Sequence, residues 1–349
     1  MPLRGAFSFQ GQAIPAGSRA TVPVPLPGQS RFTPTLMPVH IVHGKRNGPT
    51  LFVTAAIHGD EIGGIDIVRR LLRHTALKRL KGTLIAVPVV NMYGFLQHMR
   101  YLPDRRDLNR SFPGREQGSL AARVAHVLRT EIIDRSDYGV DLHTGANHRT
   151  NFPHIRANLN DPETKKLAHA FNTAVIVNAN LRDGSLRQYA LEAGKPVLLY
   201  EAGEAFRFDP TATKAGVRGL VGVLAELGMI AKRRKPKPHA TLEALSSHWV
   251  RASRSGIVTP TVKPGDRVLG GQRLASISDL TGEDHMDVLA EDDGMVLGMN
   301  QMPNVNEGDA LFHIAMFKSP ARAEVAVDAF HLSLEGLGEE DYPAHVPED

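Results

Sequence analysis

Short apolar runs and amphipathic stretches alternate through the middle of the chain. Seven runs of strand length are rich in apolar residues and lie at 37–42, 51–57, 83–90, 138–142, 152–157, 174–178 and 196–200. Between several of them, apolar residues recur at helical spacing, at 62–72, 120–133, 162–171, 185–192 and 211–227. Strands that alternate with helices predict a layered α/β fold around a mainly parallel sheet.

The two ends of the chain differ from this middle region in composition and in the elements they predict. Residues 1–35 are rich in Pro, Gly and Gln, and they predict an extended N-terminal arm with one edge strand at 20–24. Gly228 and the basic, Pro-containing stretch 231–240 mark a domain boundary. We therefore expect a main domain over 36–240, a small β domain over 241–318, and a C-terminal tail over 319–349 that is loosely packed at its end.

Beyond residue 245, short β-like segments are separated by turns. Two of these turns, Pro264-Gly-Asp266 and Glu307-Gly-Asp309, share the form Pro/Glu-Gly-Asp and lie 43 positions apart. A repeat of this kind predicts a small two-fold β barrel or sandwich.

Composition narrows the class of protein. A length of 349 residues suggests two domains, and 42% hydrophobic with 22% charged residues is ordinary for a soluble globular protein. No apolar run approaches about 18 residues, so we expect no membrane span. The N-terminus lacks the charged-then-apolar layout of a secretory signal, and the predicted location is therefore cytoplasmic. Cysteine is absent, so any metal site must use nitrogen and oxygen ligands.

The charge of the chain gives no support for nucleic-acid binding. The net charge is +4, and basic residues cluster only in the run 232–237. A nucleic-acid surface needs a wider basic face with aromatic neighbours, and neither is evident. We interpret this run as a solvated linker.

A His-x-x-Glu pair lies where a predicted strand ends and a helix begins. His58 and Glu61 follow the apolar run 51–57, and in an open α/β sheet ligands bind at the carboxyl ends of the strands. The pair alone is also typical of a capping or surface contact. However, His143 follows another predicted strand, 82 residues after Glu61. Two imidazoles and one carboxylate, with a fourth position left for water, form a recurrent catalytic zinc site.

A Pro- and Arg-rich loop follows the strand that ends near residue 90. It carries Arg100 and the pair Asn109-Arg110. A planar guanidinium beside an amide donor suits the recognition of a carboxylate. The alternative is that these side chains only tie the loop to a neighbouring carboxylate of the protein.

A carboxylate also follows the predicted strand 196–200. Glu201 lies directly at its end, where it would serve as a general base next to a metal-activated water. Glu204 is a rival for this role, but it lies farther from the strand. A capping or salt-bridging role is the alternative interpretation of Glu201.

Four motifs, in their order along the chain, resemble the succinylglutamate desuccinylase/aspartoacylase family, a branch of the zinc carboxypeptidase superfamily. They are His58-Gly-Asp-Glu61, Asp107-Leu-Asn-Arg110, Asp141-Leu-His-Thr144 and Glu201, and the match covers roughly residues 36 to 230. The resemblance implies a three-layer α/β/α sheet of the zinc-carboxypeptidase type, followed by a smaller C-terminal all-β domain of the barrel-sandwich type.

The resemblance also implies how the site works. His58, Glu61 and His143 would bind one zinc ion per chain, and Glu201 would be the catalytic base. Asp141 would orient a ligand imidazole, as carboxylates commonly do at zinc sites.

The same resemblance assigns the loop residues. Arg100 would polarise the scissile carbonyl or stabilise the oxyanion, although Arg105 or Arg106 of the same loop compete for this role. Asn109 and Arg110 would hold the carboxylate of the substrate.

The C-terminal segment is similar to the β domain that many bacterial members of the family append, which resembles a biotinyl/lipoyl-like barrel. A carrier domain of that type needs an exposed lysine on its hairpin, and the corresponding turn 290–294 has none. We therefore expect a lid or an oligomer contact instead of a swinging arm.

The predicted function is that of a zinc-dependent deacylase, which hydrolyses the amide bond of a small N-acyl amino acid or related N-acyl amine with metal-activated water. Its expected partner is this small molecule, with no nucleic acid and no membrane, and a homo-oligomer is compatible with the sequence. One alternative is a zinc carboxypeptidase for short peptides, and another is a non-catalytic ligand-binding protein on the same fold. Loops around 182–187 are expected to select the acyl group and the amine.

Overall fold

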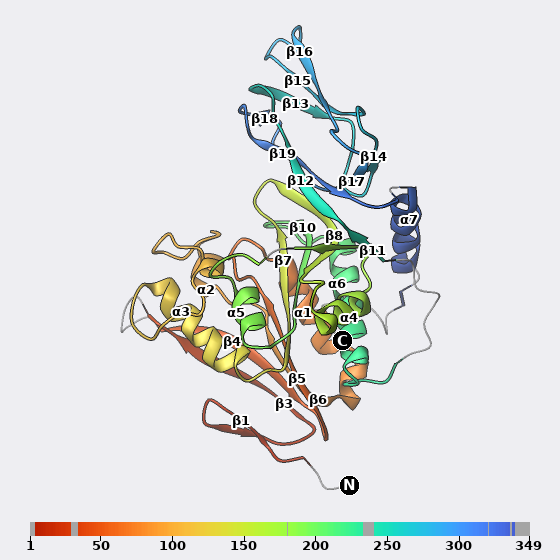
Figure 1. Ribbon diagram of the computed structural model, residues 1–349. Coiled ribbons are helices and arrows are strands. Elements are labelled where there is room, and N and C mark those ends of the chain that lie inside the picture. Colours follow the sequence, from red (N-terminus) through yellow and green to blue (C-terminus); the bar gives the residue numbers. More distant parts are fainter. Residues whose placement is uncertain are drawn as a thin grey trace.

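One mixed sheet forms the centre of the molecule (Figure 1). The computed structural model describes residues 4–28, 34–179, 181–232, 241–319, 321–335 and 337–338. The strands of this sheet that precede residue 240 are β3 (Ser18–Leu26), β4 (Thr35–His43), β5 (Arg46–Ala55), β6 (Lys81–Val87), β7 (Tyr138–Gly145), β8 (Arg149–Ala157), β9 (Val175–Asn178) and β10 (Val197–Glu204). Neighbouring strands follow the order β8-β10-β7-β5-β6-β4-β3, and β10, β7, β5 and β6 run parallel. The predicted parallel centre is therefore present.

Helices cover both faces of this sheet. One face carries α1 (Gly63–Arg73), α4 (Pro162–Phe171) and α6 (Pro210–Glu226), and the other carries α2 (Met92–Leu96), α3 (Leu120–Leu128) and α5 (Leu186–Glu192). Each side has its own apolar core: Leu71 and Phe171 are fully buried on the first, Val124 and Leu186 on the second. This arrangement confirms the predicted three-layer α/β/α fold.

Helix α4 illustrates how local sequence sets the element boundaries. The Asp161 side chain accepts a hydrogen bond from the Thr164 N–H, and Pro162 occupies the first turn. Asn172 ends the helix with a left-handed φ of 64°. A carboxylate N-cap, proline just inside the start and asparagine past the end are the signals that favour these limits.

The C-terminal region forms a second, all-β body, as predicted. Its strands are β11 (Leu242–Ala244), β12 (Ser246–Arg251), β13 (Gly256–Pro260), β14 (Arg267–Val268), β15 (Arg273–Ser278), β16 (His285–Leu289), β17 (Gly294–Asn300), β18 (Asn304–Val305) and β19 (Ala310–Met316). Strands β16, β15, β13 and β18 make a separate sheet, whereas β17 pairs with β8 and extends the central sheet into this region. The two bodies therefore share a continuous backbone ladder.

The two Gly-Asp turns of this region are built alike. The backbone N–H of Lys263 donates to the Asp266 carboxylate, and that of Asn306 donates to the Asp309 carboxylate, at 2.9 and 2.8 Å. Gly265 and Gly308 have φ angles of +97° and +85°, which favour glycine. The sequence repeat thus corresponds to a repeated turn structure.

The N-terminal residues are more regular than an extended arm. A short hairpin of β1 (Phe7–Phe9) and β2 (Gln12–Ile14) precedes β3, which pairs with β4 along its whole length. Pro23 and Pro25 lie within β3, where they are tolerated because this strand is the edge of the sheet.

A helix that the sequence interpretation missed follows the last strand. Helix α7 spans Ala321–Glu335 and buries Ala323 and Phe330 against the core shared by α1, α4 and α6. Its apolar residues Val325 and Leu332 are exposed. The apolar residues of this helix therefore do not all lie on one face, and the helical spacing is hard to recognise in the sequence. The end of the predicted loose tail, like most of the basic run 232–237, lies outside the described residues.

The proposed domain limits remain predictions. Within the described ranges, the structure contains no helix that is both long and apolar enough to cross a membrane.

Candidate active site

The three predicted metal ligands and the predicted base gather at one end of the parallel strands. His58 and Glu61 lie in the turn between β5 and α1, His143 lies near the end of β7, and Glu201 lies on β10 directly opposite His143 in the strand register. Because β5, β7 and β10 are parallel neighbours, their carboxyl ends meet at one edge of the sheet.

Close backbone packing shapes the turn that carries His58 and Glu61. A Cβ atom on Gly59 would lie 2.1 Å from the carbonyl carbon of Gly94, so no side chain fits there. The Gly59 N–H also donates to the Arg100 carbonyl oxygen at 3.3 Å. The turn is thereby held against the loop that supplies Arg100.

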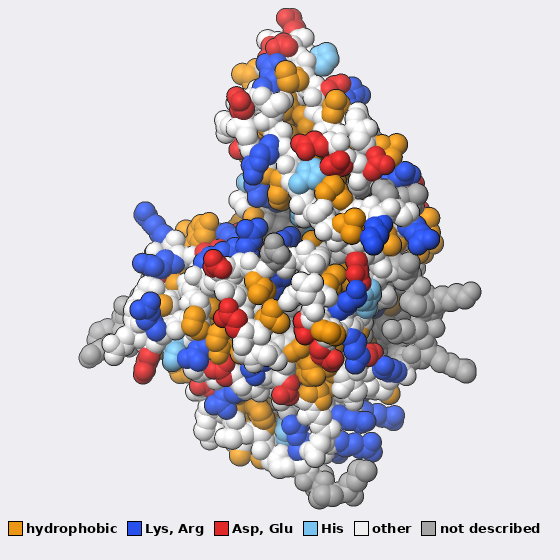
Figure 2. Space-filling model, viewed as in Figure 1, with side chains coloured by type: hydrophobic (Ala, Val, Ile, Leu, Met, Phe, Trp, Pro, Cys, Tyr) orange, Lys and Arg blue, Asp and Glu red, His pale blue; other side chains and the backbone are white. Residues whose placement is uncertain are grey.

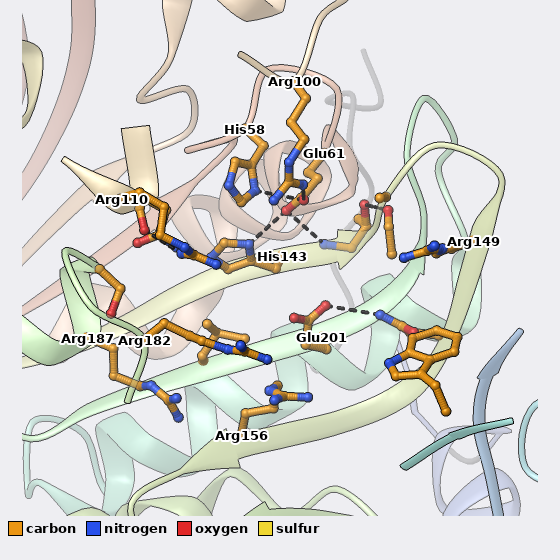
Figure 3. A pocket seen from close by; sticks show the side chains of 18 residues that line it. His58, Glu61, Arg100, Arg110, His143, Arg149, Arg156, Arg182, Arg187 and Glu201 are labelled. Carbon is orange, nitrogen blue, oxygen red and sulfur yellow. Dashed lines mark hydrogen bonds and ion pairs between the residues drawn. The ribbon is translucent and has the colours of Figure 1, made fainter. Parts of the chain in front are cut away.

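One carboxylate connects the two imidazoles (Figure 3). Nδ1 of His58 lies 2.8 Å from Glu61 Oε1, and Nδ1 of His143 lies 2.7 Å from Glu61 Oε2. One ligand atom from each residue falls within 4.8 Å of the others, and all three side chains are buried. The structure therefore brings the predicted ligand set together.

The outer nitrogen of each imidazole faces a carboxylate. His143 Nε2 lies 2.7 Å from Asp141, which also accepts a hydrogen bond from the Thr54 hydroxyl, and His58 Nε2 lies 3.1 Å from Asp107. Such partners fix the orientation of a ligand imidazole and direct its other nitrogen toward the metal. The sequence interpretation anticipated this arrangement for Asp141 but gave Asp107 no such role.

These contacts shift the pKa values of the cluster. Burial lowers the pKa of His143, but Asp141 and Glu61 outweigh burial and hold it well above the ordinary value. Burial raises the pKa of Glu61, but His58 and His143 outweigh it and hold the pKa well below its usual range. The pKa of Asp107 falls to about 2: burial raises it, but the hydrogen bond from His58 and the charges of His58 and Arg100 prevail.

The donor set fits a divalent cation such as zinc. Three carboxylates surround the two imidazoles, and both inner nitrogens converge on Glu61. Two imidazoles and one carboxylate, with no thiolate, match the composition of catalytic zinc sites.

Arg100 is the arginine of its loop that reaches this cluster. Its Nη1 lies 2.7 Å from Glu61, and its Nη2 lies 3.6 Å from Asp107. Arg105 and Arg106 are exposed and do not line the cavity. Their positions leave Arg100 as the candidate for contact with a scissile carbonyl.

Glu201 faces the same cavity as the metal cluster. Its carboxylate accepts a hydrogen bond from the Asn151 side chain at 3.0 Å. Burial, the largest effect, raises the pKa of Glu201; His143 lowers it and Glu61 raises it, and the net shift is upward. Glu204 pairs with Arg207 at 3.5 Å and does not line the cavity, so it is the weaker candidate for a base.

Asn109 and Arg110 both line the cavity, and Figure 3 shows Arg110 on the side of His58. The Asn109 side-chain oxygen accepts a hydrogen bond from the Leu186 N–H at 2.9 Å, which leaves its amide nitrogen as the group able to donate to a ligand. Arg110 is exposed and donates to the Asn109 carbonyl oxygen. Asn109 is therefore a buried group of the cavity wall, whereas Arg110 is open to solvent.

The cavity has a volume of about 320 Å³ and is rich in arginine. Besides the predicted residues, its polar and aromatic lining includes Arg149, Asn151, Arg156, Arg182, Ser185, Arg187 and Trp249. The segment 182–187 was expected to line the pocket, whereas the residues of β8 and Trp249 were not singled out. Trp249 belongs to the C-terminal body and lies against Arg149, whose guanidinium carbon is 5.1 Å from the ring centre.

Comparisons with known proteins agree with this arrangement. Residues 47–227 match the family model of the succinylglutamate desuccinylase/aspartoacylase catalytic domain. The chain is 27% identical to the N-alpha-acetyl-L-2,4-diaminobutyric acid deacetylase of Halomonas elongata, over 90% of this chain and 95% of the relative.

Solved structures show the same fold. The succinylglutamate desuccinylase/aspartoacylase of Rhodobacter sphaeroides is 25% identical, with a TM-score of 0.76 over 86% of this chain and 96% of that one. The product-bound ectoine utilization protein EutE (DoeB) of Ruegeria pomeroyi is 23% identical, with a TM-score of 0.77 over 90% and 98%. The family model spans more than half of the chain, and the resemblance seen in the four motifs is confirmed. The chain belongs to the succinylglutamate desuccinylase/aspartoacylase family and is an enzyme that hydrolyses amide bonds.

Proposed function

We propose that the chain is a zinc-dependent deacylase that hydrolyses the amide bond of a small N-acyl amino acid or related N-acyl amine. The observation that carries this proposal is the convergence of His58, Glu61 and His143, with ligand atoms within 4.8 Å of one another, beside Glu201 in the adjacent strand. The family of the chain supports the deacylase chemistry.

His58, Glu61 and His143 would hold one zinc ion per chain. Bound there, zinc would supply a Lewis acid that activates water and polarises a carbonyl group. Asp107 and Asp141 would keep the outer imidazole nitrogens protonated, so that the inner nitrogens present their lone pairs to the cation.

Glu201 would act as general base and then as general acid. Its carboxylate would take a proton from the attacking water and later deliver it to the leaving nitrogen. The upward shift of its pKa brings the group closer to the range in which it can both accept and release a proton near neutral pH. Asn151 would orient it through the 3.0 Å hydrogen bond.

The arginines would bind the negatively charged groups of the substrate and of the transition state. Arg100 would donate to the carbonyl oxygen as charge develops there, and a positioned cation is most effective at that point of the reaction. Asn109 and Arg110 would hold the carboxylate of the amino-acid half.

The size of the cavity favours a small substrate over a peptide. A volume of about 320 Å³ lies at the lower end of the range, roughly 300 to 1,000 Å³, of small-molecule sites. The compound named for the Halomonas elongata relative, an N-acetylated amino acid, belongs to this size class. A cytoplasmic location would suit an enzyme of small-molecule metabolism.

The test combines metal analysis with turnover. Purified protein should contain one zinc per chain and release amine from members of a panel of N-acyl amino acids, and a chelator should abolish this release. Hydrolysis of short peptides in preference to every N-acyl amino acid would favour the peptidase alternative. Metal-free protein that is fully active would contradict the proposal.

A further inference from the structure

A second cavity lies at the end of the parallel strands that is opposite to the active site. It has a volume of about 880 Å³ and is formed by three segments, at 17–19, 42–46 and 73–80. Arg46 begins β5, whereas His58 follows the other end of this strand. The ten residues of β5 span about 30 Å at roughly 3.3 Å per residue. A ligand in this second cavity would therefore not touch the metal cluster.

Six cationic side chains line this cavity, and none of its described lining residues is acidic. The cations are Arg19, Lys45, Arg46, Arg73, Lys78 and Arg79. The chain as a whole has 41 Lys and Arg against 37 Asp and Glu, so the excess of positive charge is local. Figure 2 shows Lys and Arg side chains gathered at the lower right of the molecule, near the lower ends of β5 and β6 in Figure 1. We call this site the basic cavity.

Hydrogen bonds to the backbone hold the three segments of the basic cavity together. The Gly17 N–H donates to the His43 carbonyl oxygen at 2.7 Å and joins the first segment to the second. The Arg19 guanidinium donates to the Leu72 carbonyl oxygen near the end of α1 and joins the first segment to the third. The third segment continues through a short 3₁₀ helix, Thr75–Arg79, which carries two of the cations. The fold therefore positions these cations without a ligand.

Protein carboxylates do not neutralise most of these cations. Within the described residues, five of the six have no carboxylate within 4.0 Å of their side-chain nitrogens, namely Arg19, Lys45, Arg46, Lys78 and Arg79. In addition, Arg46 is the register partner of Lys81 on the neighbouring strand β6, which places two like charges side by side. Like charges that are kept together repel one another, and a bound anion relieves this repulsion.

The lining of the basic cavity favours a small anion with several phosphate groups. Arg binds phosphate through its planar fork and Lys binds it as a point charge, and both types are present. Six cations on three segments exceed what one singly charged group can contact, so the ligand should carry several charges. The concave wall suits a small molecule better than a flat membrane surface. None of the described lining residues is Phe, Tyr or Trp, the side chains on which nucleic-acid bases stack.

We propose that the basic cavity is a second ligand site, which binds a small soluble anion that carries several phosphate groups. The ligand would lie between the turn before β3, the start of β5 and the 3₁₀ helix after α1. This inference does not depend on the proposed deacylase function, because the basic cavity shares no lining residue with the active-site cavity. The anion and the substrate would bind at the same time.

Lysine footprinting of the intact, metal-loaded chain tests the location of the site. Inorganic tripolyphosphate is the probe, and mass spectrometry follows the acylation of each exposed amine. A saturating concentration of the probe should slow the modification of Lys45 and Lys78 by at least about fivefold, whereas the exposed Lys263 of the C-terminal body should keep its rate. No lysine is among the described residues that line the active-site cavity, so probe bound there does not enter this readout. Unchanged rates at Lys45 and Lys78 would overturn the proposal.

Charge-removing variants assign the binding to the cations of the basic cavity. The affinity is measured as the probe concentration that half-protects Lys45. Lys78→Gln and Arg79→Gln should each weaken it by about three- to tenfold, as expected for the loss of one charged contact at an exposed position. Lys263→Gln is the matched control and should keep the wild-type affinity. Because these positions are exposed, the variants should fold and keep the wild-type kcat/KM. Unchanged affinity in both Lys78→Gln and Arg79→Gln would overturn the assignment.

Vesicles distinguish a soluble anion from a membrane surface. Vesicles of phosphatidylcholine and phosphatidylglycerol in equal parts replace tripolyphosphate in the same footprinting assay. They should protect Lys45 and Lys78 less than tripolyphosphate does, and protection by vesicles alone would overturn the soluble ligand. The outcome is also separable from the proposed function. Protection by tripolyphosphate in a chain that hydrolyses no amide would support the basic cavity and remove the deacylase, and hydrolysis without protection would do the reverse.

Discussion

The two sides of the cavity hold charge in opposite ways. In the metal cluster, His58, His143 and Glu61 are buried and each is hydrogen-bonded to a partner of opposite charge or to a second ligand. On the other side, Arg156, Arg182 and Arg187 line the cavity together with Glu201. Burial and the charge of Arg156 lower the pKa of Arg187 to about 10. The charged groups of the first side are matched by one another, whereas cations outnumber carboxylates on the second. The comparison shows that the fold itself positions the groups of the metal cluster.

Replacement of a metal ligand should reduce turnover more than any other change, because it disrupts the metal cluster. We expect His143→Ala to reduce turnover to the background rate, a loss of at least about 10⁴-fold, since both water activation and carbonyl polarisation depend on the cation. The measurement is kcat/KM on the best substrate of the panel. The exposed His285→Ala serves as control and should be fully active. Turnover by His143→Ala near the wild-type rate would contradict the assignment.

Replacement of the general base should reduce turnover less than the loss of a metal ligand does, and the metal should stay bound. For Glu201→Gln we expect kcat to fall by roughly 10²- to 10⁴-fold, the usual contribution of general acid–base catalysis. Zinc content and substrate affinity should stay close to the wild type. Zinc loss from this variant would mean that Glu201 is a ligand and that the base lies elsewhere.

Replacement of the carboxylates that face the outer imidazole nitrogens should have a smaller effect. It should weaken the affinity for the metal and leave the chemical step itself unaffected. Asp107→Asn and Asp141→Asn keep the shape of the side chain but lose the charge that the outer nitrogens face. Metal affinity should weaken by about 10- to 100-fold, measured by competition with a chelator. Asp287→Asn, on an exposed position of β16, should match the wild type.

The smallest predicted effect is a pH dependence of stability. It should arise from two buried histidines whose pKa values are lowered in part by the charge of Arg156. Burial, the largest cause, and the charge of Arg156 lower the pKa of both His154 and His313 to about 3. The unfolded chain therefore binds protons below about pH 6.5 that the folded chain does not, so the free energy of unfolding should fall as pH falls toward 3. Each imidazole contributes about 1.4 kcal/mol per pH unit at most. Denaturant unfolding of His154→Asn between pH 7 and pH 5 should show a weaker dependence than the wild type, and an equal dependence would argue against a neutral buried imidazole.

The side of the cavity that holds the metal cluster was accessible to sequence reasoning. His58, His143 and Glu201 each follow an apolar run, and parallel strands bring their ends together. The arginine-rich side of the cavity was accessible only in part. Arg156 lies inside a run that indicates a strand and nothing more, because the face to which a strand residue points depends on register.

Contacts between distant parts of the chain were not predictable. Trp249 lies beyond the proposed domain limit, and its approach to Arg149 depends on the pairing of β17 with β8. Helix α7 was missed because its apolar stripe is interrupted by exposed Val325 and Leu332. These features result from tertiary packing, which one sequence without relatives does not encode in a local pattern.

The zinc content of the purified chain, measured together with that of three variants, tests the central claim most directly. One zinc per chain is expected in the wild type and in Glu201→Gln, and less than one tenth of that in His58→Ala and His143→Ala. Wild-type protein that binds no divalent metal, or His143→Ala protein that retains a full equivalent, would contradict the account.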